Sequence, residues 1–352
     1  PLNTSKCTEL ARLGRRAWSL KRRLDTATET SHAFLLPNGL SVRLGGYDPS
    51  AIKAELAYIQ AEIDAIAFDL YGFSETDREM AEGGTQQVDA ADADEENELS
   101  ADEAPPLDAL LSWAAGVAFG RFDWRLATGE RDAPEEPDPF DPQPAQSPGM
   151  LPDEAVPFHQ HPGVLVDDSG HNHDLPRLIE AVLERVDAPV DRDIRRWLRR
   201  DFFKYHLQQY SKSRRKAPIY WPLATASGDY TLWVYYPQLT SQTLFKAIND
   251  FVEPKIREVV EDIAALRHSG ANRSRQDERR LEALVDFEAE LNELRDKLLS
   301  IAPNYKPDHD DGVQITAAPL WHLFRHTPWR KVLKETWERL ERGDNDWAKL
   351  AI

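Results

Sequence analysis

The sequence predicts a mainly α-helical α+β protein that carries one small β-hairpin and two disordered acidic linkers. Most of the chain repeats apolar residues at three- and four-residue steps, which is the period of an amphipathic helix. Residues 217–224 and 230–236 instead alternate aromatic and aliphatic residues around Ser227-Gly228-Asp229, which is typical of a hairpin. Two acidic windows are too poor in apolar residues to order themselves.

Two helices are predicted before the first acidic window. The helix over residues 3–30 is basic, with seven cations against three acids, a net charge of +4. The second covers about 50–71 and stops at Gly72, a residue type that commonly follows helix ends.

The acidic windows account for the negative charge of the whole chain, which is -18. Residues 75–108 hold thirteen acids and one cation, net -12, and residues 130–154 hold eight acids and one cation, net -7. Between them lies an apolar, small-residue stretch around Gly116 that predicts a buried helix. The rest of the chain is therefore close to neutral, and its charge is strongly polarised.

The C-terminal half predicts further helices over 176–186, 192–210 and about 329–342. Two longer helices, about 241–267 and 274–301, should form an antiparallel hairpin. Pro254 is expected to kink the first of them. The coiled-coil spacing of the second is carried by Leu284, Phe287, Leu291, Leu294, Leu298 and Ile301.

The amino-acid composition limits the cellular compartment and the kinds of site that the chain can form. Cys7 is the only cysteine, so an internal disulfide and a cysteine zinc site are both excluded, and a reducing bacterial cytoplasm is expected. No run of eighteen apolar residues and no leader pattern is present, which predicts no membrane partner. The chain begins at Pro1 rather than Met, which suggests a piece of a larger protein.

The strongest local signal is the basic cluster at 192–216, where ten cations face two acids, a net charge of +8. Arginines at three- and four-residue steps share a helical face and can neutralise several phosphates. The alternative is a solvated face that pairs with the acidic linkers. The predicted DNA-binding residues are Arg195, Arg196, Arg199, Arg200, Lys204, Lys212, Ser213, Arg214, Arg215 and Lys216.

Other polar groups carry weaker signals. Four histidines lie close together between residues 159 and 173. Histidines at such a spacing can bind zinc or iron, but structural hydrogen bonding is the favoured interpretation, and no metal is predicted. A metal nuclease would use Asp310 or Asp311, and we expect a turn there instead. No catalytic residue is predicted, because the chain has no glycine-rich cofactor loop, no P-loop and no Asn-Pro-Pro-Tyr motif. The histidines are His159, His161, His171 and His173.

One run of residues carries a resemblance to a known family. The stretch Tyr210-Ser211-Lys212-Ser213-Arg214-Arg215-Lys216-Ala217-Pro218-Ile219-Tyr220-Trp221 resembles a signature of large adenine-specific DNA methyltransferases, namely the PglX-type enzymes of BREX phage-defence systems and related type IIG restriction-modification proteins. Further segments resemble the family in the same order: Lys21–Asp25 with Thr30–Phe34, Gly116–Asp123, Gly163–Asp168 with Gly170-His171, Asp311–Val313 with Ala318–Trp321, and Asp346-Trp347.

The resemblance implies a role in DNA recognition within a larger enzyme. Such enzymes methylate adenine N6 with S-adenosylmethionine through an upstream domain, which this sequence lacks. The chain is therefore expected to be the non-catalytic DNA-binding, target-recognition and scaffold part, with double-stranded DNA and the missing methyltransferase domain as partners and no cofactor of its own. The alternative is a protein-interaction module that docks other defence-system subunits.

These interpretations divide the chain into seven segments. They are an N-terminal helical segment that joins the missing catalytic domain (1–74), an acidic disordered linker (75–108), a buried helical segment (109–129), a proline-rich acidic linker (130–158), a DNA-contact region of basic helix and hairpin (159–240), an antiparallel helical hairpin (241–302), and a C-terminal loop and helix (303–352).

Overall fold

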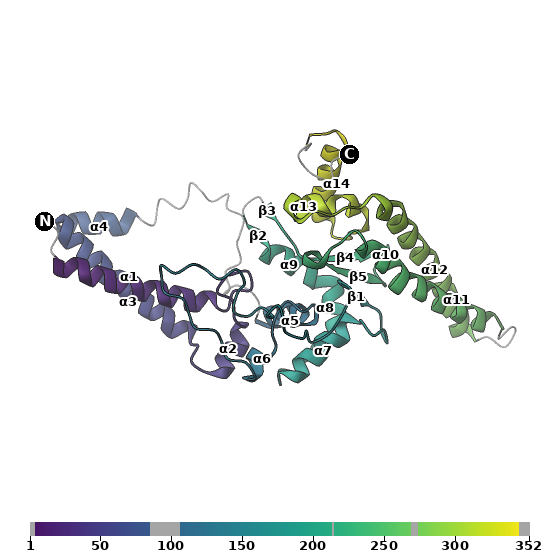
Figure 1. Ribbon diagram of the computed structural model, residues 1–352, viewed down its shortest axis with the longest axis horizontal. Coiled ribbons are helices and arrows are strands. Elements are labelled where there is room, and N and C mark those ends of the chain that lie inside the picture. Colours follow the sequence, from purple (N-terminus) through teal and green to yellow (C-terminus); the bar gives the residue numbers. More distant parts are fainter. Residues whose placement is uncertain (1–3, 85–105, 213–214, 269–273, 345–352) are drawn as a thin grey trace. The chain divides into compact units, whose positions relative to one another are not determined.

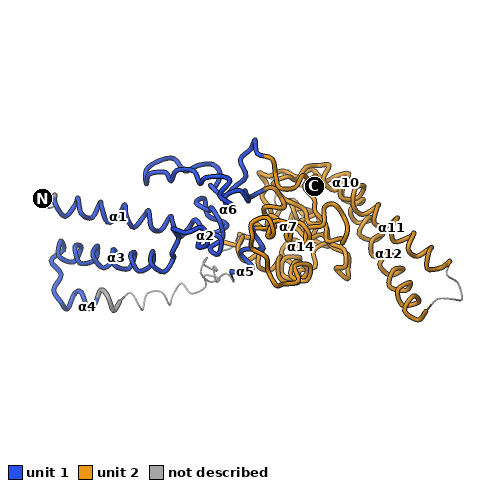
Figure 2. Tube along the Cα trace, turned by 90° about the horizontal axis from the view of Figure 1, so that it is seen from below, with its two compact units in different colours: residues 1–113, 121–155 blue, residues 114–120, 156–352 orange. Residues whose placement is uncertain are grey.

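The computed structural model describes residues 4–84, 106–212, 215–268 and 274–344. The chain forms two compact units, shown in different colours in Figure 2. Unit 1 contains residues 1–113 and 121–155, and unit 2 contains residues 114–120 and 156–352. The predicted class is confirmed, because the chain is mainly helical with small antiparallel sheets (Figure 1).

Unit 1 is helical with one long irregular segment. Its elements are α1 (Thr4–Asp25), α2 (Asn38–Leu44), α3 (Pro49–Tyr71), α4 (Glu75–Gly84), the first part of α5 (Pro106–Ala118) and α6 (Arg125–Thr128). Helix α4 lies inside the window that we predicted to be disordered from 75 to 108, so that prediction is wrong for residues 75–84. Residues 85–105 lie outside the described part of the chain.

The α1–α3 pair follows from the two predicted apolar stripes. Leu13 and Leu20 of α1 are buried against Ile52 and Ile59 of α3. Polar side chains beside this apolar contact pair across the two helices, since Arg16 donates two hydrogen bonds to Glu55 at 2.6 and 2.9 Å. Lys6 and Arg16 of α1 therefore balance acids of α3, Asp69 and Glu55.

The proline-rich acidic segment 130–154 has irregular backbone, but part of it packs within unit 1. The Gly149 N–H donates to the Phe34 carbonyl at 2.8 Å, and the Asp123 N–H donates to the Gly149 carbonyl at 3.0 Å. Arg131 donates to the buried Asp123 carboxylate at 3.0 Å. This segment is therefore held in place at its C-terminal end by backbone hydrogen bonds.

Unit 2 surrounds a three-stranded sheet. Its elements are the end of α5, β1 (Val164–Asp167), α7 (Leu175–Arg185), α8 (Ile194–Trp197), the π-helical turn η1 (Leu198–Phe202), α9 (Phe203–Gln209), β2 (Ser211–Lys212), β3 (Arg215–Lys216), β4 (Tyr220–Ala224), β5 (Thr231–Tyr235), η2 (Tyr236–Gln238), α10 (Thr243–Lys246), the π-helical turn η3 (Ala247–Val252), α11 (Glu253–His268), α12 (Arg275–Ile301), η5 (Ala302–Asn304), η6 (His309–Asp311), α13 (Val313–Ala317), η7 (Ala318–Leu323) and α14 (Thr327–Glu341).

The predicted hairpin is β4–β5, with Tyr220 opposite Tyr235 and Ala224 opposite Thr231. The sequence did not reveal the third strand, β1, which pairs antiparallel with β5 and places Asp167 opposite Thr231. All four β1 residues are buried, so the strand lacks the alternation that marks a half-buried strand. The apolar end of α5 is also fully buried, as predicted.

The long helical hairpin is confirmed as α11 and α12, which lie side by side in Figure 1. Leu291, Leu294 and Leu298 of the predicted heptad stripe are buried. Pro254 is the second residue of α11, which follows the π-helical turn η3. A proline has no N–H to donate and its ring clashes with the carbonyl four residues earlier, which fits a local departure from α-helical hydrogen bonding. Among the described residues, no helix is long and apolar enough to cross a membrane.

Gly149 provides a test of how firmly the proline-rich segment is held. A Cβ atom added there would lie 2.4 Å from the Leu35 carbonyl oxygen, so Gly149→Ala requires a backbone shift. We expect a loss of about 2 kcal/mol in the free energy of unfolding, measured by chemical denaturation.

The matched control is Gly14→Ala, because nothing lies within 4 Å of an added Cβ in helix α1. It should stabilise unit 1 by up to about 1 kcal/mol. Equal denaturation midpoints for Gly149→Ala and the unmodified chain would show that this segment is not held as described.

Candidate nucleic-acid interface

The continuous helical segment α8–η1–α9 carries the first half of the predicted basic cluster. It begins at Asp193, whose side chain accepts a hydrogen bond from the Arg196 backbone N–H at 2.9 Å. Trp197, Phe202 and Leu207 are buried and fix which side of the helix faces the core. The basic residues of this segment fall into two groups, which differ in whether they form ion pairs.

The first group is Arg195 and Arg199, which form ion pairs with buried carboxylates. Both contact Asp167, whose side chain is 0 % exposed at the end of β1. Arg195 also donates to Asp174 at 2.7 Å, and Arg199 lies 3.6 Å from Asp229. A buried carboxylate is costly without a partner, so these two arginines serve the fold.

Burial decides the protonation behaviour of this network. It raises the pKa of Asp174 above its ordinary value, although the Arg195 guanidinium opposes that shift. The pKa of Arg195 is raised, since its bonds to Asp174 and Asp167 outweigh the effect of its own burial. The arginine therefore stays charged and holds both acids at the end of β1.

The second group is Arg196, Arg200 and Lys204, which are exposed. Their side chains make no ion pair with any residue that the structure describes, in contrast to Arg195 and Arg199. The same helix thus carries two groups of cations that differ in ion pairing, and the group without ion pairs is available to an external anion.

The second half of the basic cluster forms the short hairpin β2–β3. Lys212 lies opposite Arg215, and both are exposed. Like charges directly opposite each other destabilise a strand pair, so this arrangement favours a bound anion. Lys216 is half-buried, while Ser213 and Arg214 lie outside the described residues.

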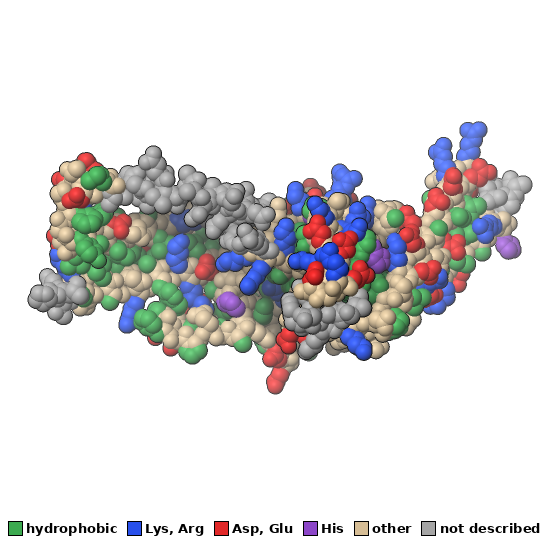
Figure 3. All heavy atoms as spheres, turned by 90° about the horizontal axis from the view of Figure 1, so that it is seen from above, with side chains coloured by type: hydrophobic (Ala, Val, Ile, Leu, Met, Phe, Trp, Pro, Cys, Tyr) green, Lys and Arg blue, Asp and Glu red, His purple; other side chains and the backbone are tan. Residues whose placement is uncertain are grey.

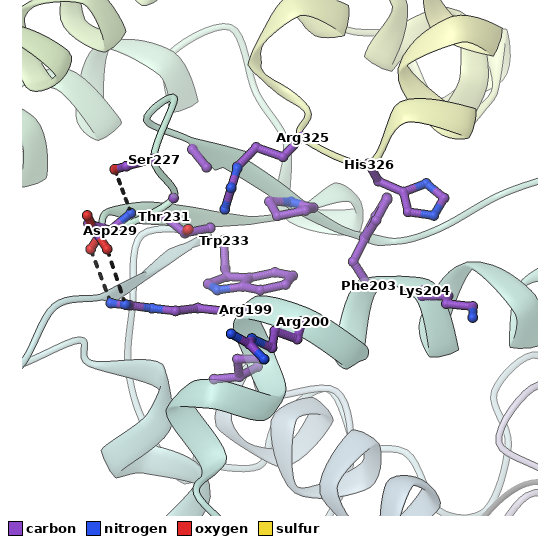
Figure 4. Close-up of a pocket in the computed structure, with 14 residues that line it drawn as sticks. Arg199, Arg200, Phe203, Lys204, Ser227, Asp229, Thr231, Trp233, Arg325 and His326 are labelled. Carbon is purple, nitrogen blue, oxygen red and sulfur yellow. Dashed lines mark hydrogen bonds and ion pairs between the residues drawn. The ribbon is translucent and has the colours of Figure 1, made fainter.

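Arg325 was not among the predicted DNA-binding residues. It precedes α14 and lines a pocket of about 460 Å³ together with residues of the basic helix. Figure 4 shows Arg325 reaching toward Trp233 from one side, while Arg199 passes on the other side toward Asp229. Arg200, Lys204 and His326 line the same pocket. An isolated arginine far along the chain carries no local signal, so only the fold could place it here.

The four histidines of the loop around β1 interact with one another and with aromatic rings. Nε2 of His159 and Nδ1 of His173 lie 2.7 Å apart and share a hydrogen bond. The rings of His171 and His173 both pack against Phe251, and Nδ1 of His161 accepts from the Gly163 N–H at 3.1 Å. Within the described residues, no group of three or more His, Cys, Asp or Glu side chains could hold a metal ion.

The carboxylates considered for a nuclease have structural surroundings. Asp310 and Asp311 lie in the turn η6, where the Asp308 side chain accepts from the Asp310 N–H at 2.9 Å. Lys255 of α11 forms ion pairs with Asp168 at 2.8 Å and Glu258 at 2.9 Å. Asp167 and the adjacent Asp168 therefore connect β1 to α8–η1 and to α11, respectively.

The ion-pair network of Asp167 makes a stability prediction. Asp167→Asn removes the carboxylate charge shared by Arg195 and Arg199, and we expect it to cost about 3 kcal/mol of unfolding free energy. Asp229→Asn is the matched control, because that carboxylate is 66 % exposed and 3.6 Å from Arg199, and it should change stability by under about 0.5 kcal/mol. Similar losses for both variants in chemical denaturation would contradict the assigned role of Asp167.

The histidine loop makes a pH prediction. Burial lowers the pKa of His161 to about 4, below its ordinary value of 6.5. The unfolded chain then binds more protons between these values, so stability should fall as the pH drops from about 6.5 to about 4. His161→Asn keeps an acceptor for the Gly163 N–H but does not titrate, and it should reduce the fall in denaturation midpoints over this range. An unchanged pH dependence would show that other groups control it.

The chain matches no known protein-family model and no curated protein. The methyltransferase resemblance therefore stays a prediction from sequence.

Proposed function

We propose that unit 2 binds the phosphate backbone of double-stranded DNA through a cationic stripe made of Arg196, Arg200, Lys204, Lys212 and Arg215. The observation that carries the proposal is that these exposed side chains form no ion pair with a described residue, whereas Arg195 and Arg199 pair with buried carboxylates. Nearby carboxylates neutralise Arg195 and Arg199, whereas none of the described acids is paired with the stripe residues of α8–η1–α9.

The stripe also has an electrostatic reason to bind a polyanion. Like charges held close together repel, and the repulsion is relieved when phosphates enter and counterions leave the nucleic acid. The fixed orientation of α8–η1–α9 presents Arg196 and Arg200 from a rigid helix, which reduces the entropy lost on binding. Contacts to phosphates position a protein on DNA without selecting a sequence.

The resemblance supplies the wider context of the proposal. In the parent protein, an upstream domain would bind S-adenosylmethionine and methylate adenine N6, while this chain would supply DNA recognition and a scaffold. The reaction is assigned to no residue of this chain.

The helical hairpin favours a second function, the docking of other defence-system proteins. Acidic and basic side chains are interspersed along this arm, at the right of Figure 3, and several pair with each other, such as Arg280 with Asp262 and Lys297 with Glu293. A mixed surface of this kind is better suited to a protein partner than to a uniformly negative duplex.

Salt dependence tests the DNA proposal. The double variant Arg196→Gln/Arg215→Gln removes two stripe cations that lie outside the pocket lining. We expect the slope of log affinity against log salt to become shallower by about two, and duplex affinity at moderate salt to fall about tenfold or more.

The matched control is Arg280→Gln/Lys331→Gln, which removes two exposed cations from α12 and α14 of the same unit. It should leave the slope within experimental error of the unmodified chain. Duplex binding that is absent, or equally salt-sensitive in all three proteins, would count against the stripe. Specific recovery of partner proteins by a chain that binds no duplex would favour the docking function.

A further inference from the structure

The pocket beside the cationic stripe has the size and the lining of a small anion site. Its volume of about 460 Å³ falls within the range of small-molecule sites. The walls come from the basic helix, the β4–β5 hairpin and the segment before α14, with Phe203 and Trp233 as apolar surface. Segments more than a hundred residues apart in sequence thus converge on one cavity (Figure 4).

Besides Arg199, three cations line this pocket. Arg200 and Lys204 are exposed, as is Arg325, and none of the three is ion-paired with a described residue. Two acids are near. Asp229 lies 3.6 Å from Arg199 and also lines the pocket, and Glu290 accepts from the Ser227 hydroxyl at 2.7 Å. Burial raises the pKa of Glu290, but the bonds from Ser227 and the charge of Arg325 lower it below its ordinary value.

The turn between β4 and β5 packs closely against Arg325. Gly228 has φ +82°, a conformation that other residues rarely adopt, and an added Cβ would lie 1.7 Å from Nη1 of Arg325. A glycine at this position therefore lets the guanidinium lie directly on the turn. Arg325 is therefore positioned by close packing against this turn.

His326 adds a neutral donor next to these cations. Its Nδ1 accepts from the Trp329 backbone N–H at 3.3 Å, which places the proton of the neutral ring on Nε2. Burial lowers its pKa, and Lys204 and Lys216 lower it further, which favours the neutral ring. The neutral ring can donate to an anion without adding to the repulsion among the cations.

We propose that this pocket binds a phosphate monoester, held by Arg200, Lys204 and Arg325 with His326 as an additional donor. Three cations that form no ion pair with a described residue fit a dianionic monoester better than a singly charged backbone diester, because the second charge gains attraction from each of them. The proposal rests on the proposed function only for one source of the ligand, the terminal phosphate of a DNA strand; free phosphate offers the same chemistry.

The test compares duplexes that carry a 5′-phosphate with the same duplexes ending in a 5′-hydroxyl, by calorimetric titration of the full chain. The unmodified chain should bind the phosphorylated duplex about tenfold more tightly. Arg325→Gln should abolish that preference, and His326→Asn, which keeps a helix-capping side chain, should reduce it. Arg330→Gln is the matched control, since it removes an exposed arginine close by on α14 that does not line this pocket, and it should keep the preference.

Inorganic phosphate is the second probe, followed by its shifts in the amide spectrum of the chain. Shifts around Arg325 that vanish in Arg325→Gln support the pocket even if no duplex binds, and in that case only the proposed DNA function fails. Phosphate shifts without any preference for the 5′-phosphate duplex support the pocket with free phosphate as the source. No preference in the unmodified chain together with no phosphate shifts would overturn the proposal.

Discussion

The buried carboxylate of Asp167 is the constraint on which the organisation of unit 2 depends. It ends a strand that is buried on all four residues, where an unpaired charge would be strongly unfavourable. Arg195 and Arg199 satisfy it from one helix, and this pairing sets how that helix turns against the sheet. The adjacent Asp168 pairs with Lys255 and connects the same strand end to the helical hairpin.

The ion pairs of Asp167 divide the basic cluster into two groups. Arg195 and Arg199 pair with buried carboxylates, whereas Arg196, Arg200 and Lys204 form no ion pair with a described residue. Arg200 and Lys204 border a cavity completed by Arg325 and His326, which come from far along the chain. Residues that hold the helix on the sheet and residues proposed to bind a ligand are thus neighbours on the same helix.

Sequence periodicity predicted the elements that bury one face against a single partner. The stripes of α1, α3 and α12 were recognisable because their leucines and isoleucines recur at helical spacing, and the β4–β5 hairpin because its strands flank turn residues. Strand β1 was missed because it is buried on both sides, and helix α4 was missed because its acidic composition resembles that of a linker. Tertiary burial explains the first case. In the second, residues 75–80 are almost all exposed, and the start of α4 is stabilised locally by hydrogen bonds between Ser74 and Asp77.

The site was predictable as a basic cluster, but not as a geometry. Spacing alone grouped Arg195 with Arg196, although their surroundings are opposite, because the deciding partners Asp167 and Asp174 lie about twenty or more residues earlier. Arg325 and the turn at Gly228 had no local signal at all. Long-range pairing of charges is therefore what separates the proposed binding surface from the residues that hold the fold together.

The partition of this helix into engaged and free arginines can be measured directly from the side-chain Nε–Hε resonances of the arginines during titration with duplex DNA. The account predicts that the signals of Arg196 and Arg200 shift progressively, while those of Arg195 and Arg199 stay near their starting positions. Equal shifts of all four arginines, or shifts confined to Arg195 and Arg199, would contradict it.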